Sequence, residues 1–427
     1  MRIEVICTGD EVLTGKTVNS NFTYITQKLE DVGLAVKWET TVGDDREDLL
    51  LAFQLAGARA DAVIVNGGLG PTVDDLSQEI AAKAAGVALV LNEPWLAHME
   101  AFFARRSRVM PPNNRKQAML PDGAEILDNP VGTACGFAVD IGRARFFFTP
   151  GVPREVRRML DHEIIPRLLK KSGMQTAIHL KRFHSYGIGE SRADTMLADV
   201  VDLAPGGTVK LGFRAHYPQL ETKLAVRGRD MDDIRRKLAP VEQEVRRRLG
   251  NFIVAEDDRT LEGVLLEALV GRQATLATVE MFTSGQIAGR FAHLPGAERV
   301  FRRGIVTREL GDVFDSVGLD RSAATGGVSR EAAEAVAQAA RRHIGSTHAL
   351  AVLIDLDEGA DRVDFSGNVC VGIATERDVA SRRSRLVGGR DWVRLGAVEM
   401  GLDCLRRLLQ GLPVHERIDF EKVDEKA

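Results

Sequence analysis

Short apolar runs alternate with amphipathic segments along the first part of the chain. Residues 2–7 (RIEVIC) are mostly apolar and read as a short buried strand. Residues 20–33 repeat apolar positions at helical spacing, and Asn19 or Ser20 stands where a helix cap is expected. Apolar strands that alternate with helices indicate a mostly parallel sheet covered on both faces. The pattern therefore predicts a three-layer, parallel-sheet α/β domain over residues 1–170.

The pattern changes twice further along the chain. Residues 171–255 combine strands with charged helices and predict a small α+β middle domain. Its basic strands suggest RNA, but the GxxG loop and stacked aromatic residues of RNA-binding modules are missing, so we expect a structural or dimerising role. Strand–helix alternation over residues 256–415 predicts a second α/β domain. Residues 416–427 form a charged tail that we expect to fray.

Composition narrows the class of protein. The 427 residues carry a net charge of −4, which gives no sign of nucleic-acid binding. No apolar run approaches the ~20 residues of a membrane span, and the first residues lack the apolar segment of a signal peptide. The four cysteines lie far apart and form no CxxC pair, which fits a reducing compartment. We therefore expect a cytoplasmic protein that binds neither nucleic acid nor membrane.

The clearest candidate site is the glycine-rich stretch NGGLGPTVDD at residues 66–75. It follows an apolar run and precedes a helical pattern. Glycines allow backbone N–H groups to approach a phosphate, and a helix N-terminus adds favourable charge. We expect Gly67, Gly68 and Gly70 to cradle phosphate and Thr72 to donate a hydrogen bond. The stretch matches neither the P-loop nor the dinucleotide fingerprint.

Carboxylates stand beside this loop. Asp74 and Asp75 would repel a bare phosphate, so they suggest a divalent cation between acid and phosphate, although capping of the next helix is an alternative. Asp10 follows the first predicted strand, and residues 149–155 form a third loop of the same kind. Because the carboxyl ends of parallel strands share one edge, we expect one common site. Asp10, Asp74 and Asp75 are the predicted metal ligands, and Asp10 and Asp75 the predicted catalytic residues.

Five motifs resemble one known family. In chain order they are TGDEVLTGKTVNSN, TTVGDD, NGGLGPTVDDLS, NPVGTACGF and TPGVPREV. Together they resemble the CinA family (competence/damage-inducible protein A), and within it the CinA-like YfaY branch. The first domain of that family is similar to molybdopterin-binding domains, which share a GGxG…D loop. Gly67, Gly68, Gly70 and Asp75 match that loop.

The resemblance implies an activity for the first domain. It implies an ADP-ribose pyrophosphatase that depends on a divalent metal (Mg, Mn or Co) and on potassium, acts on a small ADP-ribose-like nucleotide, and forms a homodimer. Asn19 and Asn21 lie near the first loop, where they either contact base or ribose or cap the helix. A domain that binds molybdopterin or a nucleotide without turnover remains the alternative.

A weaker resemblance covers the chain after residue 258. The family's C-terminal domain resembles nicotinamide-nucleotide amidase, whose motif AESCTGG contains the proposed serine nucleophile. The same stretch here is VEMFTSG, which keeps Glu280, Thr283 and Gly285 but has Met281 in place of the serine. A thioether cannot be activated by a base, and the family's lysine position holds Val313. With Arg390, the residues 280, 281, 283 and 285 form a vestigial amidase site that we expect to be inactive; residual deamidation of nicotinamide mononucleotide is the alternative.

Overall fold

The computed structural model describes residues 1–173, 177–356 and 366–422. The chain forms two compact units, Met1–His179 and Leu180–Ala427. The finer division at residues 170 and 255 stays a prediction. In the described part of the chain, no helix combines the length and the apolar character needed to cross a membrane.

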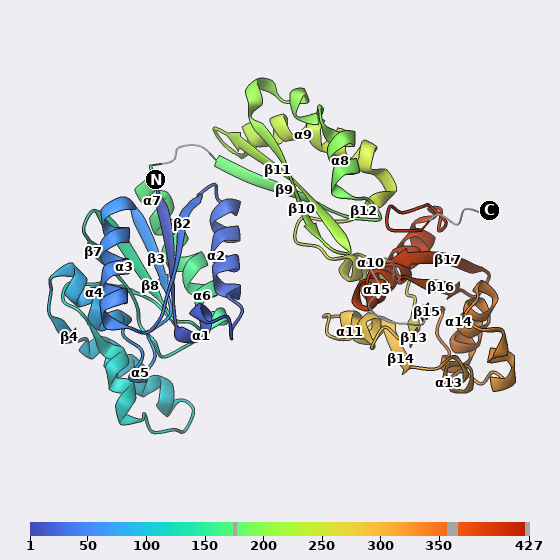
Figure 1. Cartoon of the computed structure of the whole chain (residues 1–427), viewed down its shortest axis with the longest axis horizontal. Coiled ribbons are helices and arrows are strands. Elements are labelled where there is room, and N and C mark those ends of the chain that lie inside the picture. Colours follow the sequence, from blue (N-terminus) through green and yellow to red (C-terminus); the bar gives the residue numbers. More distant parts are fainter. Residues whose placement is uncertain (174–176, 357–365, 423–427) are drawn as a thin grey trace. The chain divides into compact units, whose positions relative to one another are not determined.

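The first unit is built on a sheet with the strand order β2-β1-β3-β8-β7-β6 (Figure 1). The strands β2, β1, β3 and β8 are parallel, and β7 and β6 run antiparallel to their neighbours. The prediction of a mostly parallel sheet is confirmed. The strands are β1 (Ile3–Thr8), β2 (Val36–Val42), β3 (Ala62–Asn66), β6 (Glu125–Leu127), β7 (Gly136–Ile141) and β8 (Ala144–Thr149).

Helices cover both faces of this sheet. Alternate residues of β8 show why: Phe146 and Phe148 pack into the core under α3, α4 and α5, whereas Phe147 packs on the opposite side with α2 and α6. The predicted three-layer architecture follows. The remaining elements are α1 (Asp10–Leu13), α2 (Ser20–Asp31), α3 (Arg46–Arg59), α4 (Ser77–Ala85), α5 (Glu93–Ala104), α6 (Pro153–Met159), α7 (Ile165–Ser172), the 3₁₀ segment η1 (Pro112–Ala118), the π-helical turn η2 (Leu160–Ile164), and the paired strands β4 (Leu89–Leu91) and β5 (Met119–Pro121).

The second unit begins with a four-stranded sheet in the order β10-β11-β9-β12. The amphipathic helix α9 packs on β11 through buried residues such as Ile234 and Val245. The small α+β architecture was predicted. Its elements are β9 (Ala177–Tyr186), α8 (Glu190–Leu197), β10 (Val209–His216), β11 (Gln219–Gly228), α9 (Met231–Leu249), β12 (Ile253–Glu256), and the 3₁₀ segments η3 (Val200–Leu203), η4 (Pro205–Gly207) and η5 (Gly250–Phe252).

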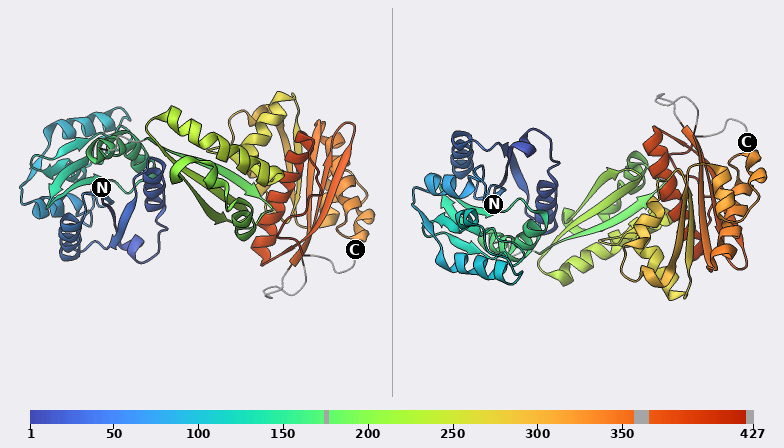
Figure 2. Two further views of the ribbon diagram at one scale, coloured as in Figure 1. Left: turned by 90° about the horizontal axis from the view of Figure 1, so that it is seen from above. Right: turned by 90° about the horizontal axis from the view of Figure 1, so that it is seen from below.

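A five-stranded sheet, β14-β13-β15-β16-β17, completes the second unit (Figure 1, Figure 2). In β15, Val352 faces the core shared with α10 and α15, and the next residue, Leu353, faces the core shared with α13 and α14. This second α/β layer structure was predicted. Its elements are α10 (Leu261–Gly271), β13 (Leu276–Met281), α11 (Gln286–Ala292), α12 (Ala297–Val300), β14 (Phe301–Thr307), α13 (Leu310–Ser316), η6 (Arg321–Gly326), α14 (Arg330–Ile344), β15 (His348–Leu356), β16 (Ser366–Ala374), β17 (Val379–Val387) and α15 (Arg390–Gln410).

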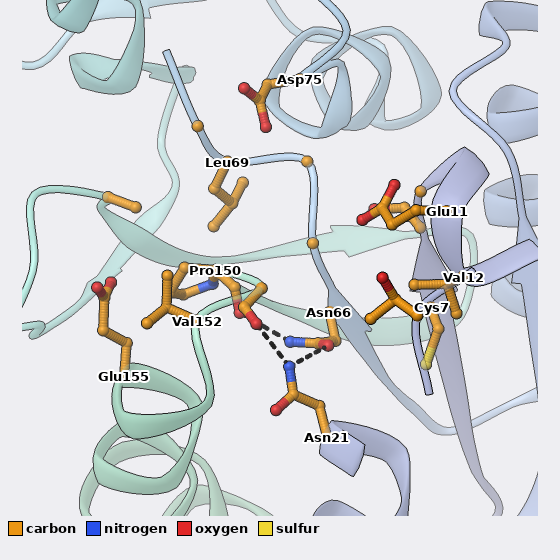
Figure 3. Close-up of a pocket in the computed structure, with 18 of the residues that line it drawn as sticks. Cys7, Glu11, Val12, Asn21, Asn66, Leu69, Asp75, Pro150, Val152 and Glu155 are labelled. Carbon is orange, nitrogen blue, oxygen red and sulfur yellow. Dashed lines mark hydrogen bonds between the residues drawn. The ribbon is translucent and has the colours of Figure 1, made fainter. Parts of the chain in front are cut away.

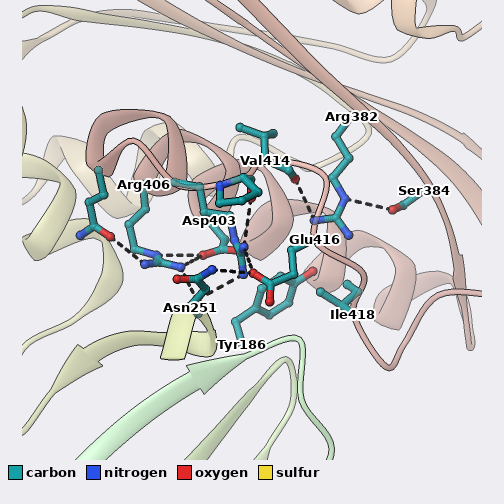
Figure 4. A network of polar contacts seen from close by, with 12 residues as sticks. Tyr186, Asn251, Arg382, Ser384, Asp403, Arg406, Val414, Glu416 and Ile418 are labelled. Atoms are coloured by element: carbon teal, nitrogen blue, oxygen red, sulfur yellow. Dashed lines mark hydrogen bonds and ion pairs between the residues drawn. The ribbon is translucent and has the colours of Figure 1, made fainter. Parts of the chain in front are cut away.

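The C-terminal tail differs from the prediction that it frays. Ile418 is 1% exposed. Glu416 pairs with the buried Arg407 (Figure 4), and Glu421 pairs with the buried Arg382. Residues 416–422 pack on the second unit because its buried guanidinium groups need carboxylate partners. Residues 423–427 lie outside the described part of the chain.

Candidate functional site

A cavity of about 640 Å³ lies at the carboxyl ends of β1, β3 and β8 (Figure 3). The loops that follow these three strands all line it, and they contribute Thr8, residues 67–70 and Glu155 among others. Parallel strands bring their carboxyl ends to one edge, which is where ligands bind in open α/β sheets. The three loops singled out in the sequence therefore share one cavity.

The glycine loop after β3 needs its glycines. Gly67 and Gly68 adopt left-handed backbone with φ of 115° and 68°. A side chain at Gly67 would come within 2.6 Å of Thr8 Oγ1, and one at Gly68 would overlap the hydroxyl of Ser77. Ser77 Oγ donates to the Gly67 carbonyl at 2.9 Å and ties the turn to the start of α4. Both conformation and space thus exclude larger residues.

Only some backbone N–H groups of the glycine loop are free to bind a ligand. The Gly67 N–H donates to the Thr149 carbonyl at 2.9 Å, so this predicted cradle group is already bonded. Among the described residues, the N–H groups of Gly68 and Gly70 have no hydrogen-bond partner. The loop can therefore present Gly68 and Gly70, but not Gly67, as backbone donors to an anion.

Thr8 ends β1 with its hydroxyl in the cavity wall. The residue is 6% exposed, and its Oγ1 has no partner within the described chain. Buried hydroxyls nearly always have a partner, and an unmet one costs about 1–3 kcal/mol. The Thr8 hydroxyl therefore points to a ligand group that would complete its hydrogen bonding.

Asp75 shapes the far end of the glycine loop. Its Oδ2 accepts hydrogen bonds from the Thr72 N–H at 2.8 Å and from the Thr72 hydroxyl. The Thr72 hydroxyl, which we expected to donate to phosphate, is therefore directed at Asp75. Gly70 leaves the space that the Asp75 carboxylate occupies. Lys116 Nζ donates to the Thr72 carbonyl and holds the same turn from outside.

Carboxylates from two loops and from the end of β2 line the cavity: Glu11, Asp44, Asp74 and Asp75. Asp10 is not among the lining residues, because its Oδ1 accepts the Asp44 N–H at 3.2 Å while Asp44 Oδ2 accepts the Asp10 N–H at 3.2 Å. Burial raises the pKa of Asp44, and the nearby negative charges of Asp10, Glu11 and Asp74 raise it further. The first loop thus offers Glu11 to the cavity in place of the predicted Asp10.

The predicted three-carboxylate metal site is not assembled. Within residues 1–173, 177–356 and 366–422, no three or more His, Cys, Asp or Glu side chains are grouped to hold a metal ion, so Asp10, Asp74 and Asp75 do not form such a group. A nucleotide-bound Mg²⁺ usually takes only one or two carboxylates and completes its shell with phosphate oxygens and water. The acids that line the cavity suit that second arrangement.

Two asparagines fix the start of α2 beside the cavity. Asn19 Oδ1 accepts the Phe22 N–H at 3.0 Å, which confirms the capping alternative for this residue. Asn21 Nδ2 donates to Asn66 Oδ1 at 3.0 Å and to the Gly151 carbonyl at 2.7 Å (Figure 3). Asn21 thereby joins α2 to the loops after β3 and β8, and its amide group is committed to the shape of the site.

In the second unit, β13 and the turn that follows it carry most residues of the predicted vestigial amidase site. Glu280 is fully buried. Its carboxylate accepts hydrogen bonds from the Thr283 hydroxyl, from the Ile287 N–H at 3.0 Å and from the Ala288 N–H at 2.7 Å. Gly285 precedes α11 in left-handed backbone with φ of 73°. These retained residues hold the start of α11.

The positions that should carry amidase chemistry hold apolar side chains. Met281 is 6% exposed, Val313 is fully buried, and both pack into the core with α14. Arg390 lies 5.9 Å from the centroid of the Phe282 ring, and Arg308 lies 4.2 Å from the same centroid. The turn therefore presents a scaffold without a nucleophile at the expected position.

Three family models match successive parts of the chain. Residues 4–170 match the model of a probable molybdopterin binding domain, residues 181–255 that of the damage-inducible protein CinA KH domain, and residues 258–409 that of the CinA C-terminal domain. A CinA-like protein of Shewanella sediminis is 39% identical over 415 residues, which are 96% of each chain. The chain belongs to the CinA family.

Other CinA relatives carry more specific names. A Shewanella oneidensis protein named nicotinamide-nucleotide amidohydrolase PncC is 37% identical over 96% of both chains. A solved structure of the protein CinA, of unknown function, from Thermoplasma acidophilum is 33% identical and covers 40% of this chain and 96% of its own, with a TM-score of 0.35.

Three cavity residues of this CinA-family chain were not singled out in the sequence, and neither was Lys116, which holds the Thr72 turn from outside the cavity. The three cavity residues are Thr8, Glu11 and Glu155. Thr8, Glu11 and Glu155 stand within the three loops that the sequence did single out, so the loops carried a signal although the individual side chains did not. Lys116 comes from η1, whose approach to Thr72 depends on the tertiary fold.

Proposed function

We propose that the first unit binds a nucleotide diphosphate such as ADP-ribose and, with a divalent cation, hydrolyses its pyrophosphate bond. The observation that carries the proposal is the cavity in which the unpartnered Thr8 hydroxyl and the open N–H groups of Gly68 and Gly70 stand beside carboxylates. Donors of this kind suit phosphate oxygens, and acids in the same cavity suit a cation that accompanies them.

The chain's own residues would bind and orient the ligand. Thr8 and the glycine loop would hold the phosphates, and Asp75 would keep the loop closed through Thr72. Glu11, with Asp74 or Asp75, would hold the cation, which when bound supplies charge neutralisation and a more acidic water. Asn21 would hold α2 at a fixed distance from the loops after β3 and β8.

The proposal is tested by release of AMP from ADP-ribose with Mg²⁺, Mn²⁺ or Co²⁺, with and without potassium. We expect turnover by the unchanged chain and a loss of at least about 100-fold in Asp75→Ala, because the loop loses the acceptor that closes it. Asp140→Ala is the matched control, since Asp140 lies in β7 outside the cavity lining. Binding of ADP-ribose without product would instead favour the binding-only alternative, and equal turnover in the two variants would reject the assignment.

A second candidate is deamidation of nicotinamide mononucleotide by the second unit. The name of the Shewanella oneidensis relative supports it. The buried Met281 and Val313 oppose it, because neither can act as nucleophile or base. Release of ammonia from nicotinamide mononucleotide by the unchanged chain would establish this activity.

A further inference from the structure

Glu155 places a buried carboxylate in the wall of the cavity. The residue is 7% exposed and lies across the cavity from Glu11 (Figure 3). Its Oε2 accepts a hydrogen bond from Asn129 Nδ2 at 2.8 Å. Within the described ranges, the Asn129 hydrogen bond is the only polar side-chain contact of this carboxylate: Oε1 has no hydrogen-bond partner, and no Lys, Arg or His pairs with it. One acceptor oxygen is therefore left open toward the cavity.

The surroundings hold this carboxylate in one position. Asn129 is fully buried, and its Nδ2 also donates to the Ala134 carbonyl at 2.9 Å, which fixes the amide with its donor toward Glu155. A side chain at Gly132 would overlap the Glu155 carboxyl group. The neighbouring Arg154 turns away and donates to the Val131 carbonyl at 2.9 Å.

A buried carboxylate without a cation is costly unless hydrogen bonds satisfy it. A ligand that brings an N–H or O–H donor to Oε1 would supply the missing bond. Leu69, Ala134 and Val152 line the same cavity and suit a flat, largely apolar ring. Oε2 already accepts from Asn129, whereas Oε1 is free to accept one N–H of an amino group carried by such a ring.

We propose that Glu155 reads the exocyclic amino group of an adenine base in the nucleotide bound by this cavity. The proposal rests on the proposed function in that it takes the ligand to be a nucleotide. It makes Glu155 a specificity-determining residue whose partner is the base, while the phosphates lie at the glycine loop.

The test compares binding of ADP and of inosine 5′-diphosphate by calorimetry, which needs no turnover. We expect the unchanged chain to bind ADP at least about tenfold more tightly, because the inosine base places a carbonyl oxygen where the amino group stood. In Glu155→Gln, the amide oxygen takes the Asn129 hydrogen bond and the NH₂ group faces the cavity. This variant should lose or reverse the preference for ADP.

Glu11→Gln is the matched control, because it removes the same charge across the cavity from Glu155. It should change the affinities for both nucleotides together and leave their ratio unchanged. Equal affinities in the unchanged chain, no binding of either nucleotide, or an unaltered ratio in Glu155→Gln would overturn the proposal. Absence of AMP release together with an intact preference for ADP would reject the hydrolase and retain the assignment of Glu155.

Discussion

Thr8 is the residue whose role can be separated most cleanly from stability. Its hydroxyl has no partner in the described chain, so Thr8→Val removes no protein hydrogen bond. We expect no loss of thermal stability, because the hydroxyl that is removed is buried and unmet, and about tenfold weaker binding of ADP, which is the size of one lost hydrogen bond. Thermal unfolding and calorimetry on the same variant check both parts.

Thr149→Val is the control for Thr8→Val. The Thr149 hydroxyl donates to the Val65 carbonyl at 3.2 Å and accepts from Asn66 Nδ2 at 3.1 Å. Its loss leaves buried polar groups unpaired and should lower the free energy of unfolding by about 1–3 kcal/mol. A Thr8→Val variant that unfolds as readily as Thr149→Val would show that the Thr8 hydroxyl serves the fold.

Met281 gives a second prediction at this scale. Met281→Ser restores the hydroxyl of the resembling motif but not the base, since Val313 remains in the core. We expect no ammonia from nicotinamide mononucleotide and a loss of about 2–5 kcal/mol in unfolding free energy, because a buried side chain is truncated. The Shewanella oneidensis relative, which is named as a nicotinamide-nucleotide amidohydrolase, serves as the positive control for the ammonia assay. Ammonia release by the variant would mean that the turn retains a working base.

Single residues also mark what the sequence could not reveal about the site. The sequence identified the loops after β1, β3 and β8, because glycines and acids at strand ends are a local signal. Whether Asp10 or Glu11 faces the cavity depends on two hydrogen bonds between Asp10 and Asp44, in which each carboxylate accepts the backbone N–H of the other residue. These two residues are far apart in sequence. Nothing local to Glu155 shows that Asn129 will hold it.

At the scale of elements, Glu256 ties β12 to α9 and β9. Its carboxylate accepts two hydrogen bonds from Arg246 at 2.8 Å, and Lys181 Nζ lies 2.6 Å from Oε2. The Arg246 hydrogen bonds, followed by those of Lys181, lower the pKa of Glu256 from 4.5 to about 2. A depressed carboxyl pKa stabilises the fold above the unfolded pKa, and this contribution is lost as pH falls from about 4.5 toward 2.

Glu256→Gln should therefore unfold at lower urea concentration than the unchanged chain at neutral pH, and the gap should close as pH falls through this window. The exposed Glu298 supplies the control, since Glu298→Gln removes a carboxylate that lies 3.9 Å from Arg299 at the surface. A gap that stays constant with pH would show that the carboxylate charge is not what joins these elements.

Elements differ in how visible they are in the sequence. The strand β15 can be recognised in the sequence, because every residue from Ala349 to Ile354 is apolar, and the structure buries all of them between two helix layers. The strand β17 has no such apolar run, because it buries the polar residues Ser381, Arg382 and Ser384, with Ser381 on the face opposite to the other two. Those polar residues are satisfied by distant partners such as Glu421, so their burial has no local signature.

At the scale of the whole chain, the C-terminal tail connects separate parts of the second unit through side-chain contacts. Glu421 pairs with Arg382, whose side chain is 3% exposed. Asn251 Nδ2 donates to Glu416 at 3.0 Å, and Asp419 accepts the Gly189 N–H at 2.8 Å. The end of the chain thereby fastens its four-stranded and five-stranded sheets together.

Glu421→Ala leaves Arg382 buried without its carboxylate and should lower the free energy of unfolding by about 3–5 kcal/mol. Glu298→Ala, at an exposed pair, should change it by less than about 0.5 kcal/mol. Urea unfolding of both variants gives the comparison. Equal effects would mean that the tail packs on the second unit without stabilising it.

The three hydrogen bonds that Glu280 accepts give this acid a structural role at the start of α11, apart from any reaction. A chain that lacked this acid would leave the Ile287 and Ala288 N–H groups without their acceptor, so the fold itself needs Glu280 whether or not a substrate is turned over. A match to the amidase motif at Glu280 therefore says that the scaffold is the same. The neighbouring position, which holds Met281, is the one that bears on the chemistry.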